Sequence, residues 1–270
     1  MGRAVRYRGA ALADGLGPVL RRPVTITVQD GLVTGVADGD GDELAAPSVG
    51  REEVVIDASG ATIVPGFVDS HSHLTLQGGA QWIARGADPT ADLIDAAEQN
   101  AGALLRAGVR WARDVGSPRR ADAGDGRERA LALGLRDRWR GQAGYPYIRA
   151  AGTWLTKAGS LPAGLAIEVT DADALLAAAL AQLDDGADLV KLYLDGPDAG
   201  IAPWSADEVR RAVSAVHSRG ATVAAHGSGL ANCRLGAESG VDTLEHGFAL
   251  DDDDRAFRQR CGQLCHLRAT

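Results

Sequence analysis

The fold is decided by the stretch Val64-Pro65-Gly66-Phe67-Val68-Asp69-Ser70-His71-Ser72-His73-Leu74. It begins as an apolar strand and ends in two histidines, His71 and His73. On a strand, residues i and i+2 point to the same side, so both imidazoles can face one point. Neutral imidazole is a strong ligand for zinc and related divalent ions. Because the chain holds only six histidines, we interpret this pair as metal ligands rather than as incidental loop residues.

From residue 63 onward, apolar strands alternate with helical patterns. We expect strands at residues 63–69, 109–114, 147–151, 189–194, 222–225 and 243–245, and helices at 92–107, 171–183, 205–219 and 234–239. Strands and helices that alternate at this spacing predict a parallel sheet in an α/β fold. A doubly wound open sheet and a closed (β/α)8-type TIM barrel both fit. No glycine-rich phosphate-binding sequence follows the first strand, and polar residues at the strand ends favour the barrel, whose active site lies at that face.

Residues 1–62 are predicted to form a small N-terminal β-sandwich portion. Residues 24–28 and 32–36 alternate on either side of Asp30-Gly31, a hairpin turn signal. Two further short strands, at 54–57 and 61–64, flank the turn at Ser59-Gly60. This segment is too short for a complete sandwich. We therefore expect two domains, a partial β-sandwich at residues 1–62 and a (β/α) barrel at residues 63–270.

Composition excludes several classes of partner. The net charge of −8 argues against nucleic acid and anionic membranes, which demand a basic face. No stretch approaches the ~18 apolar residues of a membrane span, and the first residues lack the apolar run of a signal peptide. Three cysteines are too few for a disulfide framework, so a cytoplasmic location is the default expectation. Arg119-Arg120 and residues 136–140 are interpreted as solvated helix faces.

Three more candidate ligands stand near the ends of later strands. Lys191 is one of only two lysines among 28 basic residues, and it lies in the fourth predicted strand. A lysine that faces a barrel interior is costly as a cation unless it is paired or chemically altered; a lysine paired with a carboxylate at the rim fits equally well. His226 and His246 close the fifth and sixth strands, and each precedes a glycine that lets the backbone turn away. Together with His71 and His73 they form a coherent metal-binding set.

Other chemically active residues carry weaker signals. His217 lies on the predicted helix at 205–219 and is expected at the surface. Cys261, Cys265 and His266 lack the fourth ligand of a zinc knuckle. Lys157 is either a substrate contact or solvated. The acidic run at 251–254 is typical of a helix N-terminus.

The chain resembles the amidohydrolase superfamily, and within it the imidazolonepropionase-like and Xaa-dipeptidase group. The resemblance covers residues from about 20 to 254. It rests on motifs that occur in the family's order: Pro-Gly-Phe-Val-Asp-Ser-His-Ser-His at 65–73, Arg-Asp-Val-Gly at 113–116, Arg-Ala-Ala-Gly at 149–152, Val-Lys-Leu at 190–192, Ala-His-Gly at 225–227 and Glu-His-Gly at 245–247.

This resemblance implies a binuclear metal site. The matching lysine of the family is carboxylated by CO2 and bridges two divalent ions, for which zinc is the default. His71, His73 and carboxylated Lys191 would hold one ion, and Lys191, His226 and His246 the other. The implied reaction is hydrolysis of an amide or peptide-like C–N bond, in a small-molecule amide or dipeptide-like substrate, by a hydroxide that bridges the two ions.

The family also supplies an Asp at the end of its eighth strand, which moves the proton to the leaving group. Here six strands, with a seventh around 263–270, precede the last residue, and no Asp follows Asp254. We therefore expect a C-terminally truncated or frameshifted, incomplete barrel in which no catalytic residue is identified. Its open strand edges predict poor stability unless another chain, as in a homo-oligomer, covers the gap.

Three interpretations stand side by side. The chain is a metal-dependent amidohydrolase, a non-catalytic remnant or metal-binding subunit that needs a partner, or an unrelated α/β binding protein with incidental histidines. Metal content separates the third interpretation from the first two, and turnover separates the first from the second. Substrate identity is not legible in the motifs, because specificity lies on strand-end loops such as residues 153–165 and 196–203.

Overall fold

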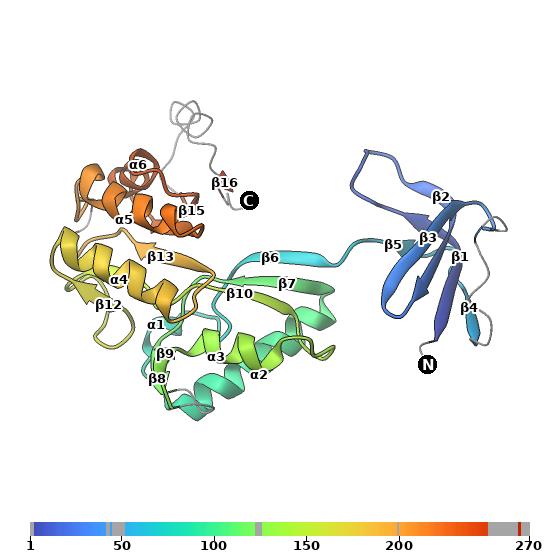
Figure 1. The fold of residues 1–270 in the computed structure, drawn as a ribbon, viewed down its shortest axis with the longest axis horizontal. Helices are drawn as coiled ribbons and strands as arrows, with labels where there is room; N and C mark the ends of the chain where they lie inside the picture. The colour runs from blue at the N-terminus through green and yellow to red at the C-terminus, as the bar shows by residue number, and fades with distance from the viewer. Residues whose placement is uncertain are drawn as a thin grey trace. The chain divides into compact units, whose positions relative to one another are not determined.

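The computed structural model describes residues 3–41, 44, 52–121, 126–198 and 200–247, together with the backbone of Leu264–Cys265. The chain divides into two compact units, Met1–Gly66 and Phe67–Thr270 (Figure 1). Among the described residues, no helix has both the length and the apolar character that crossing a membrane requires.

The first unit is a single five-stranded sheet. Its strands are β1 (Ala4–Leu12), β2 (Arg21–Gln29), β3 (Leu32–Asp38), β4 (Glu53–Asp57) and β5 (Thr62–Ile63). The order is β3-β2-β1-β4, with β5 also beside β1; β1, β2 and β3 pair antiparallel, whereas β4 and β5 run parallel to β1. The predicted hairpin turn is confirmed, because Asp30 and Gly31 both adopt positive φ, as a two-residue turn of type I′ requires.

Most strands of the second unit pair in parallel, and one short pair, residues 119–121 with residues 128–130, is antiparallel. Its strands are β6 (Phe67–Ser72), β7 (Val109–Asp114), β8 (Arg119–Ala121), β9 (Glu128–Ala130), β10 (Tyr147–Ala150), β11 (Leu155–Lys157), β12 (Ile167–Val169), β13 (Leu189–Tyr193), β14 (Thr222–Gly227), β15 (Thr243–His246) and β16 (Leu264–Cys265). One parallel sheet has the order β10-β7-β6, and another has the order β12-β11-β13-β14-β15-β16. A parallel bridge between Ala151 and Leu189 joins the two.

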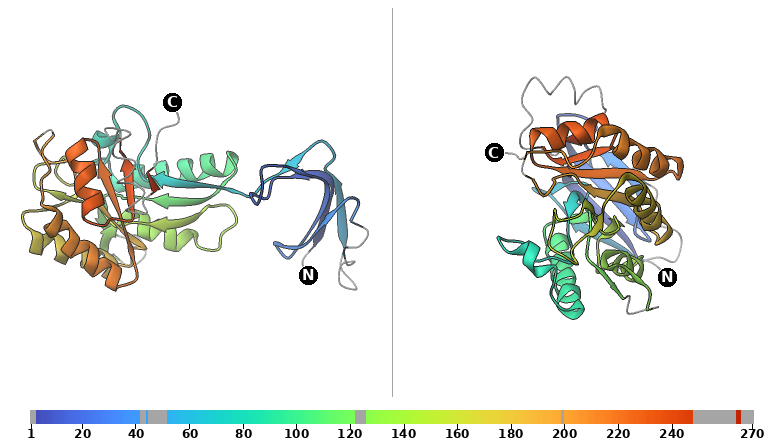
Figure 2. Two further views of the ribbon diagram at one scale, coloured as in Figure 1. Left: turned by 90° about the horizontal axis from the view of Figure 1, so that it is seen from above. Right: turned by 90° about the vertical axis from the view of Figure 1, so that its left-hand side faces the viewer.

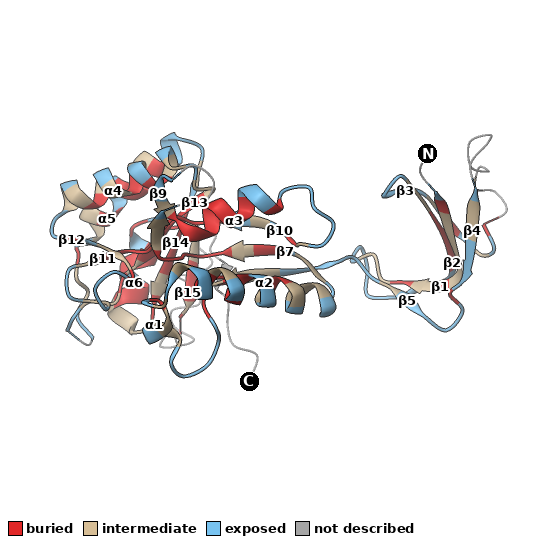
Figure 3. Cartoon of the chain, turned by 90° about the horizontal axis from the view of Figure 1, so that it is seen from below, coloured by how far each residue is buried: buried red, intermediate tan, exposed pale blue. Residues whose placement is uncertain are grey.

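Helices cover these strands from outside (Figure 2). They are α1 (Trp82–Arg85), α2 (Thr90–Arg106), α3 (Leu131–Trp139), α4 (Ala172–Asp184), α5 (Ala206–Ser218) and α6 (Leu230–Glu238). The main core forms where the apolar stripes of α4 and α5 pack on β13 and β14, through residues such as Leu175, Val213, Val190 and Val223. Figure 3 shows the resulting split, with buried inner faces and exposed outer faces on the helices.

The expected strand and helix sequence is largely confirmed, and its errors have physical reasons. All six expected strands are present, and the capping box between Ser205 and Glu208 begins α5 as predicted. The first strand is displaced to Phe67–Ser72, because Pro65 has no backbone N–H to pair at its expected start. The short elements β8, β9, β11, β12 and α1 were not predicted, since none shows a strong apolar period, and α3 was predicted only through the helix face at residues 136–140.

The interpretation of the arginine blocks as solvated helix faces is wrong in part. Arg119 and Arg120 belong to strand β8. Arg136 lies on α3 but is buried, where it donates to the Asp188 carboxylate at 2.7 Å and to the Gly186 carbonyl at 2.9 Å. Asp188 also accepts the backbone N–H of Ala150, so this ion pair ties α3 to the strand β10 and to the segment before β13.

Replacing Arg136 by Met is therefore expected to lower the free energy of unfolding by about 2–4 kcal/mol, because it leaves the Asp188 carboxylate without its cation. Arg140→Met is the matched control. The Arg140 side chain is 71% exposed, and its ion pair with Asp137 spans 3.4 Å, so its loss is expected to change stability by no more than about 0.5 kcal/mol. Urea unfolding measures both; equal effects would contradict the buried role of Arg136.

Candidate metal centre

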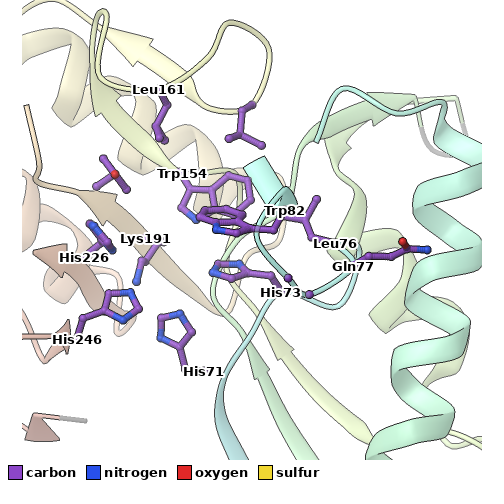
Figure 4. A pocket seen from close by; sticks show the side chains of 14 residues that line it. His71, His73, Leu76, Gln77, Trp82, Trp154, Leu161, Lys191, His226 and His246 are labelled. Atoms are coloured by element: carbon purple, nitrogen blue, oxygen red, sulfur yellow. The ribbon is translucent and has the colours of Figure 1, made fainter. Parts of the chain in front are cut away.

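The five predicted ligands converge on one pocket of the second unit. His71 belongs to β6 and His73 follows directly after it, Lys191 lies on β13, His226 on β14, and His246 at the end of β15. Parallel register places these ends at one edge, with Tyr193 opposite His226 and Gly227 opposite His246. All five residues line a pocket of about 340 Å³ (Figure 4). The ring centroids of His71 and His246 are 4.8 Å apart, and those of His226 and His246 are 4.7 Å apart.

Lys191 is the most unusual of the five. Its side chain is 1% exposed, and its Nζ has no hydrogen-bond partner among the described residues. Burial lowers the pKa of this amine to about 7, against the opposing influence of the Glu245 carboxylate and with a further lowering by Arg113. A buried amine without a partner is costly, so this position is explained best by a group that is absent from the protein chain itself.

Three of the four imidazoles have one nitrogen held by an acceptor. His73 Nδ1 lies 2.9 Å from the Gly116 carbonyl, and His71 Nδ1 lies 2.6 Å from Glu245 Oε2. His226 Nε2 lies 2.9 Å from Asp195 Oδ2. Because a carbonyl or carboxylate oxygen accepts, each of these nitrogens carries the proton, and the opposite nitrogen keeps its lone pair. Metal-binding histidines are oriented in this way.

The electrostatics of the pocket favour the neutral form of His73, His226 and His246. Burial lowers the pKa of His73 to about 3, although the hydrogen bond to Gly116 acts in the opposite direction. Burial, together with the charges on His226 and His71, lowers the pKa of His246 to about 4. Burial also lowers the pKa of His226. Neutral imidazole is the form that binds a metal ion.

Glu245 is the centre of a buried network beneath the histidines. Its carboxylate accepts from His71 at 2.6 Å and from Arg113 at 2.8 Å, and Thr243 Oγ1 lies 2.9 Å away. Arg113 also donates to the Ser70 carbonyl. Burial would raise the pKa of Glu245, but the hydrogen bond from His71 and the charges of Lys191 and Arg113 hold it well below its usual range. The carboxylate therefore stays ionised and links β15 to β6 and β7.

Asp195 plays the corresponding part for His226. Its carboxylate accepts from His226 at 2.9 Å, from the backbone N–H of Ser228 at 3.0 Å and from Asn232 at 2.7 Å. The ring of Tyr193 stacks on the His226 imidazole, nearly parallel to it, with the ring centroids 4.2 Å apart. His226 is thus fixed both in its plane and about its axis.

Two backbone features lie at the strand ends beside the pocket: a positive φ at His246 and a turn held by Asp114. His246 has a φ of 73°, a conformation that costs a non-glycine residue on the order of 1–3 kcal/mol and that gathers at functional sites. After β6, the carboxylate of Asp114 accepts the backbone N–H groups of Leu74 and Gly116. Burial raises the pKa of Asp114 to about 7 despite these two hydrogen bonds. Asp114 thereby fixes the turn that carries His73.

The residues fit a divalent metal site on chemical grounds. As the side chains stand, the described part of the chain contains no three His, Cys, Asp or Glu residues spaced to hold an ion. The set that converges is four imidazoles and one lysine, and a lysine amine becomes an anionic ligand only after modification. The unpartnered Nζ of Lys191 and the three fixed imidazole tautomers are the observations that favour such a group here.

The remaining sequence-based candidates lie elsewhere. His217 is exposed on α5 and bonds to Asp242. Lys157 donates to the Thr170 carbonyl and lies over the Trp204 ring, outside the pocket lining. Residues 153–165 line the pocket through Trp154, Leu161 and Leu165, as expected, whereas residues from 196–203 line a separate hollow beside Asp195. The side chains of Cys261, Cys265 and His266 and the acidic run at 251–254 lie outside the described residues.

Sequence reasoning missed the residues that hold the ligands. Glu245 and Arg113 occur inside the quoted motifs, and Asp195 lies four residues after Lys191, but their roles depend on contacts across the sheet. The signal that could have found them is charge: an acidic residue inside a buried strand, directly before a candidate ligand, requires a partner.

Comparison with known proteins places these features in a family context. The model of the amidohydrolase family matches residues 54–134. An uncharacterized protein of Mycobacterium tuberculosis (strain H37Rv) is 31% identical over 233 residues, which are 81% of this chain and 52% of that protein. An imidazolonepropionase of Salinispora arenicola is 41% identical over 88 residues, 32% of this chain and 20% of that enzyme. The chain thus spans about half the length of the first of these relatives.

Solved structures share the fold over nearly the whole chain. A Xaa-Pro dipeptidase with methionine bound in its active site superposes with a TM-score of 0.78 and 21% identity, over 97% of this chain and 66% of that one. This likeness concerns the mixed α/β fold.

Replacing Lys191 by Met tests whether its amine lacks a partner. In chelator and CO2-depleted buffer, Lys191→Met is expected to raise the free energy of unfolding by about 1–3 kcal/mol, because a buried polar group without a hydrogen bond is removed. The control is Lys157→Met, which removes the hydrogen bond to the Thr170 carbonyl. Its free energy of unfolding is expected to fall by about 0.5–1.5 kcal/mol. Destabilisation by the Lys191 variant in urea unfolding would show that the amine has a partner in the chain.

Proposed function

The chain belongs to the amidohydrolase superfamily, and we propose that it serves a metal-dependent hydrolysis of an amide or peptide-like C–N bond. The observation that carries this proposal is the convergence of four imidazoles on the buried amine of Lys191, which has no hydrogen-bond partner among the described residues. The amine interacts with the Glu245 carboxylate only through its charge and makes no hydrogen bond to the described residues, which suits the precursor of a ligand.

In the proposed site, His71, His73 and Lys191 hold one divalent ion, and Lys191, His226 and His246 hold the other. Lys191 acts as a carbamate. Its neutral amine attacks the carbon of CO2, an N–C bond forms, and one N–H proton leaves to solvent, so that a neutral side chain becomes an anion. The lowered pKa of Lys191 supports this step, because only the neutral amine is a nucleophile. Zinc is the expected metal for an imidazole-rich set.

Such ions, when bound, would polarise a scissile carbonyl and make hydroxide available from water at neutral pH. The protein's own residues prepare the site. Glu245 and Asp195 hold the Nδ1 proton of His71 and the Nε2 proton of His226, so that the lone pairs face inward. Gly116 does the same for His73 through its carbonyl. Apolar side chains on the far side of the pocket limit the water that can enter.

We also propose that the second unit is part of a (β/α)8-type barrel. Two observations support this proposal. Successive parallel strands follow the chain order from β6 through β7 and β10, across the Ala151–Leu189 bridge, to β13, β14 and β15. The carboxylate of Glu245 on β15 reaches His71 on β6 and Arg113 on β7. Strands that are far apart in the pairing order therefore face one another, as they do where a sheet curves toward closure.

A second candidate function is metal binding without turnover. Within the described residues, no carboxylate lines the pocket. The carboxylates beside it are committed to other partners: Glu245 to Arg113 and His71, Asp195 to His226, Ser228 and Asn232, and Asp114 to the backbone of Leu74 and Gly116. A group that moves a proton to a leaving amine is therefore not among the described pocket residues. Turnover separates this candidate from the hydrolase.

Metal content tests the site itself. Elemental analysis of the folded protein, after equilibration with zinc and bicarbonate and removal of free metal, is expected to give close to two equivalents. Lys191→Ala is expected to retain less than half of that amount, because both ions lose a shared ligand. Lys157→Ala, the only other lysine-to-alanine change available, should match the parent. Little metal in a folded parent protein, or equal metal in both variants, would rule out the proposed site.

Turnover tests the reaction. The zinc-loaded protein is expected to hydrolyse at least some members of a panel of N-acyl amino acids, dipeptides and simple amides, followed by mass spectrometry of both products. Hydrolysis should stop with chelator and with Lys191→Ala, since both remove the ions. Full metal content without product formation across the panel would select the metal-binding candidate instead.

A further inference from the structure

The pocket has two chemically unlike ends. One end is formed by the four imidazoles and Lys191. The rest of the lining includes two tryptophans and three leucines, here called the apolar wall: Leu76, Trp82, Trp154, Leu161 and Leu165. Figure 4 labels the first four of them. A ligand whose polar group reaches the imidazole end must therefore place the rest of its body against aromatic and aliphatic surface.

The apolar wall is built into the protein rather than exposed by chance. Leu76, Trp154 and Leu165 are each less than 5% exposed and belong to one core cluster, against which Trp82 and Leu161 pack. Pockets with rigid apolar linings and a few placed polar groups are typical small-molecule sites. The wall thus keeps its shape when no ligand is bound.

Two glycines make room for the wall. A Cβ on Gly116 would lie 2.7 Å from the Trp154 ring, and Gly116 has a φ of 133°. A Cβ on Gly86 would lie 2.3 Å from Leu165 Cδ1. Gly116 also supplies the carbonyl that orients His73, so one backbone position serves both ends of the pocket.

The two tryptophans meet the metal-binding end at His73. The Trp82 ring is nearly parallel to the His73 imidazole, with centroids 6.0 Å apart and planes inclined by 7°. The Trp154 ring lies 5.1 Å away at 45°. A flat apolar group that contacts these indole rings would lie next to the imidazole end of the pocket.

Charge decides which ligands this arrangement favours. Among the described residues that line the pocket, Lys191 and the four histidines are the acidic or basic side chains, and they stand at the imidazole end. Gln77 and Tyr193 are the other polar side chains of the described lining. Gln77 accepts a hydrogen bond from Arg85, which does not line the pocket and is already paired with Asp88. A carboxylate placed against the wall would be desolvated without a cation to pair with, which is unfavourable by several kcal/mol in general.

We propose that this pocket binds uncharged amides that carry an aromatic or branched aliphatic group, with that group against Trp82, Trp154 and the leucines, and that it disfavours a carboxylate on that group. The assignment of the amide to the imidazole end rests on the proposed function. Recognition of the apolar group does not, because the wall is formed by the chain alone.

Binding to the metal-free protein tests this inference separately from catalysis. The probes are N-benzylacetamide, N-methylacetamide, which lacks the ring, and 4-(acetamidomethyl)benzoate, which carries a carboxylate at the far end of the ring. The indole N–H signals of the five tryptophans are followed by NMR during titration. N-benzylacetamide is expected to bind at least about tenfold more tightly than either other probe and to shift the Trp82 and Trp154 signals.

Variants locate the bound ring. Trp82→Ala is expected to lower the affinity for N-benzylacetamide about five- to tenfold. Trp111→Ala is the matched control, because Trp111 is half exposed and stacks on Tyr147 outside this pocket; it should leave binding unchanged. Leu161→Arg adds a cation to the wall at a partly exposed position and is expected to reverse the preference toward the benzoate.

The outcomes distinguish the two proposals. Equal binding of the three probes, or equal effects of the Trp82 and Trp111 variants, would overturn the inference even if the protein holds two metal ions. Selective ring binding in a protein that takes up no metal would overturn the proposed function and leave the inference standing.

Discussion

The structure of the second unit depends on one buried carboxylate. Glu245 is completely inaccessible to solvent, and a charge in that position is tolerated only when it is fully paired. Its two oxygens divide between Arg113 from β7 and His71 from β6. This arrangement neutralises the charge of the carboxylate and links β15 to β6 and β7. It also orients His71, a candidate ligand. Removing either partner would leave a buried ion behind, so the three residues form a single structural unit.

The same carboxylate shapes the electrostatics above it. It opposes the effect of burial on the Lys191 amine, which otherwise lies among imidazoles held neutral by desolvation. The result is a pocket that is rich in lone pairs but contains little fixed positive charge. Cations of high charge density are the natural complement of such a set, whereas the apolar wall beyond His73 complements uncharged carbon. In the proposed function, the first end would supply the chemistry and the second would recognise the substrate.

The sequence predicted the convergence of the five candidate ligands better than their surroundings. The spacing of His71 and His73, and the histidines before Gly227 and Gly247, are properties of strand ends, and the parallel register brings them to one edge as expected. The elements with clear periodicity, such as α5 with its capping box, were predicted for the same local reason. Arg136 shows the opposite case. Its burial depends on Asp188, fifty-two residues away, and no local pattern records that contact.

The apolar wall could not be predicted from the sequence for a related reason. Trp82 and Trp154 come from segments far apart in the chain, and each packs against His73 only after β6, β7 and β10 have paired. Gly116 and Gly86 lack a Cβ atom, and this leaves space for the side chains of Trp154 and Leu165. A single sequence shows that these glycines are present, but the reason for them is three-dimensional.

The central claim is that Lys191 becomes an anionic ligand, and carbon-13 NMR tests it most directly. The protein is equilibrated with zinc and 13C-labelled bicarbonate and then freed of unbound label. With only two lysines in the chain, a lysine carbamate signal can be assigned by substitution alone. The account predicts one carbamate resonance that persists in Lys157→Ala and disappears in Lys191→Ala. The absence of that resonance in the zinc-loaded parent, or its survival in Lys191→Ala, would contradict it.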